Sequence, residues 1–110
     1  MTGHCGVKIS ESEILITGGK TSPGTGSETA ETWIYDFKTE EYKPGPSMIY
    51  ARHRHGCTKF KSKFYDNRPV VLVIDHFGEP DEDTIEILDY TVSGSSWREC
   101  KCIYIPYSLN

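Results

Sequence analysis

The residues of this chain with the clearest capacity for chemistry are its cysteines and histidines. Cys100 and Cys102 are two positions apart, so an extended strand would place both sulfur atoms on one face. Thiolate sulfur and imidazole nitrogen are ligands that suit zinc. The full set is Cys5, Cys57, Cys100, Cys102, His4, His53, His55 and His76. Its spacing matches no usual zinc module, and we predict neither a metal site nor a cofactor.

The cysteines have two other interpretations. Cys5 and Cys57 occupy equivalent strands of a repeat described below, where a free cysteine is commonly a buried small apolar residue. The alternative is a disulfide framework, which requires an oxidising compartment. The sequence favours the first interpretation and leaves the redox state of all four cysteines open.

Acidic and hydroxyl side chains form no recognisable catalytic arrangement. Paired carboxylates occur at Glu40 and Glu41 and again at positions 81–83, in polar turns with no apolar enclosure to raise a pKa. The second turn lacks the spaced oxygen ligands of a dedicated calcium loop. The sequence contains no Gly-x-Ser-x-Gly elbow and no phosphate-binding glycine loop. We therefore expect a protein that is not an enzyme.

The charge balance argues against several classes of partner. Lys and Arg total 12 against 16 Asp and Glu, and the one basic cluster, residues 52–55, is too short to follow a phosphate backbone. No apolar run reaches the length of a membrane span, and residues 1–6 have neither the charged nor the apolar part of a signal peptide. We expect no nucleic-acid or membrane partner. We also expect a cytoplasmic location, or an extracellular one if the natural N-terminus is missing.

The chain is predicted to consist of short strands separated by turns. Residues 32–37 and 41–43 form a hairpin that Pro44, Gly45 and Pro46 end, because proline cannot donate to a β-ladder. Residues 13–17 and 70–74 are apolar at successive positions, which is typical of strands covered on both faces. The other strands are expected at residues 2–10, 55–61, 84–90 and 96–102.

This pattern of strands occurs twice. Equivalent residues lie 51, 53 and 55 positions apart: His4 and His55, Asp36 and Asp89, and Tyr42 and Trp97. Two units therefore fill the chain, at residues 1–54 and 55–110. A repeat of about 50 residues belongs to architectures in which one unit cannot bury its own faces.

With these motifs, the chain resembles two kelch repeats of a β-propeller. The residues that carry the resemblance, and that it implies are structural, are His4, Gly18, Gly19, Tyr35, Asp36, Tyr42, Pro46, Met48, His55, Gly56, Asp89 and Trp97. The resemblance implies an all-β fold of two four-stranded antiparallel kelch-like blades of an incomplete β-propeller. Propellers have about 4 to 8 blades. We therefore expect further blades, in cis in a longer product of which this chain is a fragment, or from a second chain.

The resemblance also implies a non-catalytic module that presents loops to a protein partner, as an adaptor or substrate receptor. The residues expected to contact the partner are Lys20, Thr21, Ser22, Arg52, His53, Arg54, Glu79, Asp81 and Glu82. The aromatic residues Trp33, Tyr35, Tyr42 and Trp97 are expected to pack between blades. The alternatives are a secreted or metal-binding kelch-type protein with enzymatic activity, and a truncated product without a function of its own.

Overall fold

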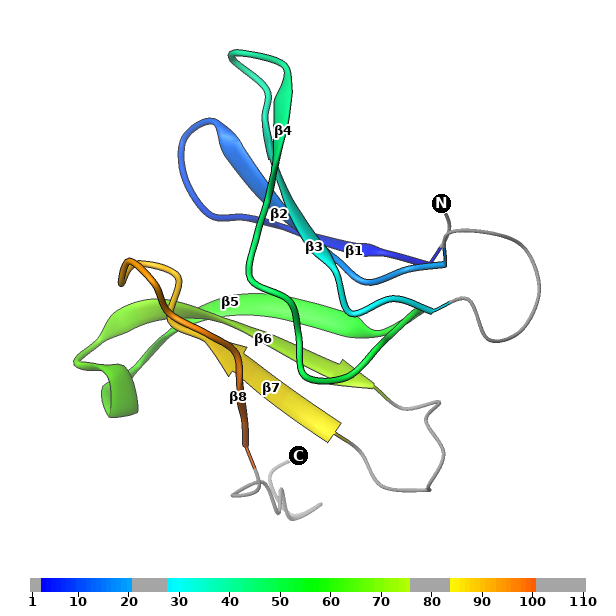
Figure 1. Cartoon of the computed structure of the whole chain (residues 1–110). Coiled ribbons are helices and arrows are strands. Elements are labelled where there is room, and N and C mark those ends of the chain that lie inside the picture. The colour runs from blue at the N-terminus through cyan, green and yellow to red at the C-terminus, as the bar shows by residue number, and fades with distance from the viewer. Residues whose placement is uncertain (1–2, 21–27, 76–83, 101–110) are drawn as a thin grey trace.

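The protein is built from two antiparallel four-stranded β-sheets (Figure 1). A computed structural model describes residues 3–20, 28–75 and 84–100. The first sheet consists, in this order, of β1 (Cys5–Lys8), β2 (Glu13–Thr17), β3 (Thr32–Asp36) and β4 (Glu41–Pro44). The second sheet consists of β5 (Gly56–Ser62), β6 (Arg68–Asp75), β7 (Thr84–Leu88) and β8 (Arg98–Glu99), and the 3-10 turn η1 (Lys63–Tyr65) follows β5. The predicted fold class is therefore confirmed: the chain is all-β, with two sheets arranged like propeller blades.

The strand positions follow the predicted ones closely. β2 has the predicted bounds, and β6 is longer than predicted. β4 includes Pro44, which pairs with Trp33, although proline was expected to end the hairpin one residue earlier. β4 is an edge strand of its sheet. Proline has no amide hydrogen to donate to a neighbouring strand, and an edge strand tolerates this because one of its sides has no neighbour. The predicted last strand is observed only as Arg98–Glu99, and residues 101 and 102 lie outside the described ranges.

An aspartate shapes the turn after the third strand of each sheet. The Asp36 carboxylate accepts hydrogen bonds from the amides of Lys38 at 2.9 Å and Thr39 at 3.3 Å. These bonds, that of Lys38 above all, lower the pKa of Asp36 below its ordinary value. The equivalent Asp89 accepts a hydrogen bond from the Thr91 hydroxyl at 3.0 Å. Both aspartates thus accept a local hydrogen bond where the turn begins, and Asp89 is also bonded to Arg68 of β6.

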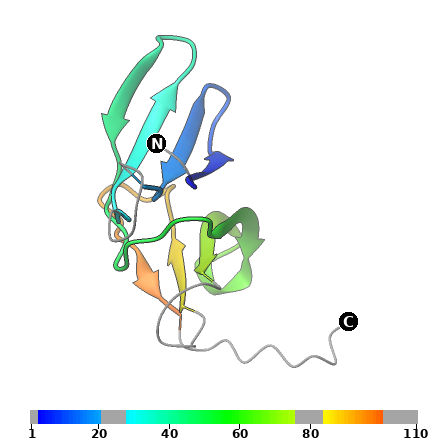
Figure 2. The same ribbon diagram turned by 90° about the vertical axis from the view of Figure 1, so that its right-hand side faces the viewer.

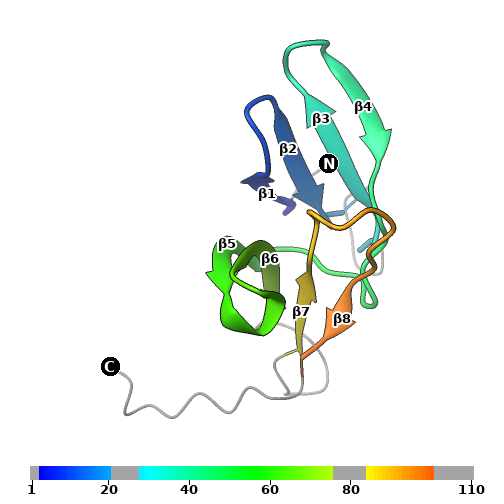
Figure 3. The same ribbon diagram turned by 90° about the vertical axis from the view of Figure 1, so that its left-hand side faces the viewer.

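The hydrophobic core lies between the two sheets. Its buried residues are Val7, Leu15, Met48, Val71, Val73, Leu88 and Trp97. Along β2 the buried Leu15 and Thr17 alternate with the half-buried Ile14 and Ile16. The prediction that this strand is covered on both faces is thus wrong within the described chain, where one face packs against the other sheet and the opposite face stays open. Figures 2 and 3 show the two sheets one above the other.

A disulfide joins the two sheets. Cys5 on β1 is bonded to Cys57 on β5, across a sequence separation of 52 residues. The interpretation of these cysteines as free buried residues is therefore wrong, because the repeat places the first strands of both sheets side by side and their sulfur atoms in reach of each other. Cys100 is also disulfide-bonded, and Cys102 lies outside the described residues.

Candidate partner-binding surface

The link between the sheets, residues 45–55, is anchored by a buried ion pair. Arg52 Nε and Nη2 donate to Glu86 Oε2 at 3.1 and 2.8 Å, and Arg52 Nη1 donates to the Thr84 carbonyl at 2.9 Å. Both charged side chains are 0% exposed. A buried charge is costly unless it is paired and hydrogen-bonded, and here both partners are satisfied. The ion pair therefore fixes the link on the second sheet.

The same carboxylate also holds the backbone of the link. Glu86 Oε1 accepts the amide hydrogen of Ile49 at 2.6 Å, and Oε2 accepts that of Tyr50 at 3.1 Å. Together with the two bonds from Arg52, the Glu86 carboxylate receives four hydrogen bonds. A single side chain of β7 thus positions three residues of the link.

Backbone hydrogen bonds fix the link on the first sheet as well. The Arg52 amide donates to the Thr29 carbonyl at 3.1 Å, and the Arg52 carbonyl accepts from Gly19 at 2.7 Å. Gly18 has φ +63°, and a Cβ there would lie 2.4 Å from the Arg52 oxygen. The Met48 amide donates to Ala30 at 2.8 Å. The diglycine is therefore required because the link crosses the end of β2 at close range.

Several side chains of this fixed backbone are open to solvent. Ile49 is 50% and Tyr50 is 39% exposed. Arg54 is exposed, while its amide donates to the Gly3 carbonyl at 2.7 Å. His53 Nδ1 lies 3.4 Å from Glu28 Oε1. We define the rim surface as Lys20, Glu28, Ile49, Tyr50, His53 and Arg54.

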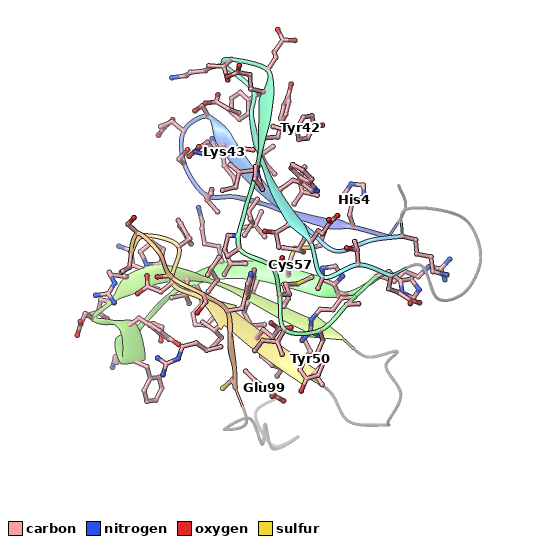
Figure 4. All side chains as sticks on the ribbon, in the orientation of Figure 1. His4, Tyr42, Lys43, Tyr50, Cys57 and Glu99 are labelled. Carbon is pink, nitrogen blue, oxygen red and sulfur yellow. A yellow bond between two sulfur atoms is a disulfide. The ribbon has the colours of Figure 1, made fainter. Side chains whose placement is uncertain are left out.

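Tyr50 is held in place from two sides. Its hydroxyl donates to Glu99 Oε1 at 3.1 Å, and Figure 4 shows the two side chains pointing toward each other. The guanidinium carbon of Arg52 lies 5.8 Å from the centre of the Tyr50 ring, a cation–π distance. The hydrogen bond to Glu99 raises the pKa of Tyr50 above its ordinary value. Tyr50 therefore presents an aromatic edge in a defined orientation.

The residues predicted to contact a partner fall into three groups. Lys20, His53 and Arg54 belong to the rim surface. Arg52 is fully buried against Glu86, so its charge is not available at the surface. Thr21, Ser22, Glu79, Asp81 and Glu82 lie outside the described residues.

Ile49 and Tyr50 were not among the single residues predicted to contact a partner, although they lie in the same inter-blade loop as Arg52, His53 and Arg54. Their exposure identifies them as surface residues of that loop. The available signal was an apolar pair directly after Met48, which itself enters the core.

Most of the motif residues in the link and in the second sheet have structural roles. The Pro46 carbonyl accepts hydrogen bonds from Trp97 Nε1 at 2.9 Å and from Thr32 Oγ1 at 2.8 Å. His55 is buried, with Nε2 at 2.6 Å from Thr17 Oγ1. Trp97 is the one predicted inter-blade aromatic residue that lies in the core between the two described sheets. These contacts hold the start and the end of the link.

Other motif residues lie elsewhere than predicted. Tyr35 and Tyr42 have ring centres 4.6 Å apart and share, with Trp33, the face of the first sheet that points away from the second sheet. Tyr42 is 64% exposed, and Figure 4 shows it on the opposite side of the sheet from Lys43. His4 is exposed, unlike its buried equivalent His55. The expected packing of these aromatic residues between blades is therefore not found within the described chain.

The described residues contain neither a cluster of metal ligands nor a membrane-crossing helix. Among residues 3–20, 28–75 and 84–100, no group of three or more His, Cys, Asp or Glu side chains is placed to hold a metal ion. In the same ranges no helix is long and apolar enough to cross a membrane. His76, one of the cysteines and histidines considered as metal ligands, lies outside the described residues.

Comparison with known proteins finds no relative. No protein-family model matches the chain. No curated protein and no solved structure matches it either. The function therefore has to be inferred from the geometry of the chain itself.

Proposed function

We propose that this protein is a non-catalytic binding module of adaptor type, built from two kelch-like blades, which presents the rim surface to a protein partner. The observation that carries this proposal is the contrast within the link. Its backbone is fixed by the buried Glu86 carboxylate, while the side chains of Ile49, Tyr50 and Arg54 remain exposed.

A fixed backbone with exposed side chains favours binding for a physical reason. Ordering a loop on association costs free energy, and a loop already ordered in the free protein avoids that cost. Aromatic residues and arginine are enriched in the cores of protein interfaces. Tyr50 and Arg54 supply one of each, and Tyr50 is already oriented by Glu99.

The composition of the rim surface indicates the chemistry of the partner. Ile49 and Tyr50 offer an apolar contact, and Arg54 adds a positive charge next to the Glu28–His53 pair. Such a surface fits a protein segment with an apolar side chain beside a carboxylate.

The disulfide supports an oxidising location. The sequence allowed a cytoplasmic protein or an extracellular one. The bond between Cys5 and Cys57 favours the extracellular alternative, because structural disulfides form and persist in oxidising compartments. We propose that the module works there.

The test is capture of a partner by the intact oxidised chain and by two matched variants. The rim variant carries Ile49→Ser, Tyr50→Ser and Arg54→Ser. The control variant carries Val92→Ser, Phe37→Ser and Lys38→Ser, which also remove one aliphatic, one aromatic and one basic exposed side chain. The control positions lie in the β3–β4 and β7–β8 turns, at the other end of the sheets (Figure 1).

The expected result is a protein retained by the wild-type chain and the control variant and lost from the rim variant. Retention of the same proteins by all three chains would exclude the rim surface as the binding site. Circular dichroism spectra and denaturation midpoints of the variants establish that each is folded.

A further inference from the structure

The first sheet has an open face that is apolar and aromatic. Trp33 and Tyr35 of β3 share this face with Ile16 of β2 and Tyr42 of β4, as the strand register requires. A hollow of about 570 Å³ lies here. It is lined by His4, Ile16, Glu31, Trp33 and Tyr42. We call this surface the first open face.

The second sheet has an open face of its own. Leu72 and Ile87 pair on it beside Arg98, and Phe60 lies on the same face, where its partner Val70 is already buried. A hollow of about 710 Å³ lies over this face. It is lined by Phe60, Leu72, Ile87 and Arg98 together with Lys61, Ser62, Lys63, Phe64, Tyr65, Glu99 and Cys100. We call this surface the second open face.

The repeat relates each open face to a face that is already packed. Val7 lies in the core between the sheets, and its equivalent 51 residues later, Thr58, lies beside Leu72 on the second open face. Tyr35 lies on the first open face, and its equivalent 53 residues later, Leu88, lies in the core. The two sheets are therefore packed head to tail, through two faces that are not equivalent in the repeat. The second open face is equivalent to the packed face of the first sheet, and the first open face is equivalent to the packed face of the second sheet.

We propose that the occupant of each open face is a second copy of this chain, packed head to tail, so that the second open face of one copy covers the first open face of the next. This arrangement continues the contact that already joins the two sheets. A head-to-tail contact forms a ring where its rotation closes. Propellers contain about 4 to 8 sheets, so a ring would contain about two to four copies.

Charge favours this pairing over the pairing of like faces. Among the described residues, Lys61, Lys63 and Arg98 surround the hollow of the second open face, with Glu99 as its single acidic residue. In the described part of the chain, Glu31 is the only Asp, Glu, Lys or Arg that lines the hollow of the first open face, and Lys8 lies on the same face outside the hollow, in register with Ile14 and Tyr35. Two copies of the second open face would bring like charges together, which costs free energy, whereas Glu31 at the hollow of the first open face is an acidic partner for these cations.

This inference goes beyond the proposed function and is independent of it. The rim surface consists of link residues together with Lys20 and Glu28, whereas the two hollows are lined by other residues. Glu99, which lines the second hollow and accepts a hydrogen bond from Tyr50, lies next to both surfaces and is left unchanged in every variant. Failure of partner capture therefore leaves self-association untouched, and failure of self-association leaves the rim surface untouched.

The test uses analytical ultracentrifugation of the full oxidised chain and of two single-face variants. Tyr42→Lys places a cation on the first open face, opposite the basic second open face. Phe60→Glu places an anion on the second open face. Both residues are exposed, so neither substitution empties the core, and circular dichroism establishes that the variants fold. Ile16→Lys and Leu72→Glu provide a second pair on the same two faces if either variant is unfolded.

The proposal predicts that the wild-type chain forms assemblies of about two to four copies. Each variant alone should be monomeric, with self-association weakened about 30-fold or more. An equimolar mixture should associate into dimers or larger assemblies, because each variant keeps the face that the other has lost and the two substituted faces carry opposite charges. A monomeric wild-type chain, a dimer of either variant alone, or a mixture that stays monomeric would overturn the proposal.

Discussion

Arg52 and Glu86 meet in an ion pair that neither water nor a partner reaches, although Arg52 belongs to the most basic segment of the sequence. The pair connects the link to β7, and its carboxylate also holds the amides of Ile49 and Tyr50. Its role is therefore to position the rim surface. The exposed residues around it are the ones available for contact.

Replacing Arg52 by Met should destabilise the protein strongly. The substitution leaves the Glu86 carboxylate buried without its cation, and breaking a buried pair in this way costs about 3–5 kcal/mol. Denaturation with guanidinium chloride at pH 7 measures the free energy of unfolding. Removal of Glu86 in the same background should not be additive, because the two side chains share hydrogen bonds.

A second ion pair provides the matched control. Lys43 Nζ lies 3.2 Å from Glu13 Oε2, with the lysine side chain 64% exposed. Lys43→Met should change the free energy of unfolding by about 0–1 kcal/mol. Equal effects of the two substitutions would contradict the buried role of Arg52.

The disulfide between Cys5 and Cys57 should contribute a large share of the stability. It closes a sequence separation of 52 residues, which corresponds to about 4 kcal/mol of lost chain entropy in the unfolded state. The variant with Cys5→Ala and Cys57→Ala should therefore unfold at a clearly lower denaturant concentration than the oxidised wild-type chain. Peptide mapping of the non-reduced protein should recover the two cysteines in one linked pair. Free thiols at both positions would show that the bond does not form.

Gly18→Ala should be more harmful than Gly94→Ala, although both glycines have a positive φ. At Gly18 the added Cβ meets the Arg52 carbonyl oxygen at 2.4 Å and His55 Cε1 at 2.8 Å, whereas at Gly94 nothing lies within 4 Å. Gly94→Ala should cost only the backbone term of about 1–2 kcal/mol, and Gly18→Ala should cost more. Thermal unfolding of the two variants side by side measures the difference. Similar melting temperatures would contradict the close crossing of the link.

Asp89 should make the stability depend on pH in the acid range. Arg68 donates to its carboxylate at 2.6 and 3.1 Å, and this bonding lowers the pKa of Asp89 below its ordinary value of 3.8. A lowered pKa in the folded state stabilises the protein above the unfolded pKa, and this contribution is lost as the pH falls through the folded pKa. Asp89→Asn should therefore lower the denaturation midpoint at pH 7, and its effect should shrink as the pH falls below 3.8.

Asp66, an exposed carboxylate that pairs with the same arginine, is the control for this prediction. Asp66 Oδ2 lies 3.1 Å from Arg68 Nη1, and its side chain is 90% exposed. Asp66→Asn should shift the midpoint at pH 7 by much less, because exposed pairs contribute little. Parallel pH profiles of wild type and Asp89→Asn would contradict the assigned role of Asp89.

The sequence was sufficient to predict the strands because each apolar strand segment is bounded by residues typical of turns. Apolar runs such as residues 13–17 lie between glycine-rich or polar segments, and the recurrence of Asp36 as Asp89 revealed that the unit is repeated. The local pattern therefore determines both sheets.

The residues of the site were harder to predict because they depend on contacts distant in the sequence. Arg52 looks like a surface cation until Glu86, 34 residues later, is placed beside it. Met48, Ile49 and Tyr50 are three successive large side chains, and only the contacts of the folded chain show that Met48 fills the core while Ile49 and Tyr50 stay exposed. The Cys5–Cys57 bond likewise follows from the packing of two sheets, which no local pattern reveals.

The most direct test of the central claim, that the link is a pre-ordered platform, is amide hydrogen exchange of the free protein followed by NMR. Hydrogen bonds to Glu86 and Thr29 should protect the amides of Ile49, Tyr50 and Arg52 as strongly as those in the middle of β6. Exchange of these three amides at the rate of an unstructured peptide, with β6 protected, would contradict the account.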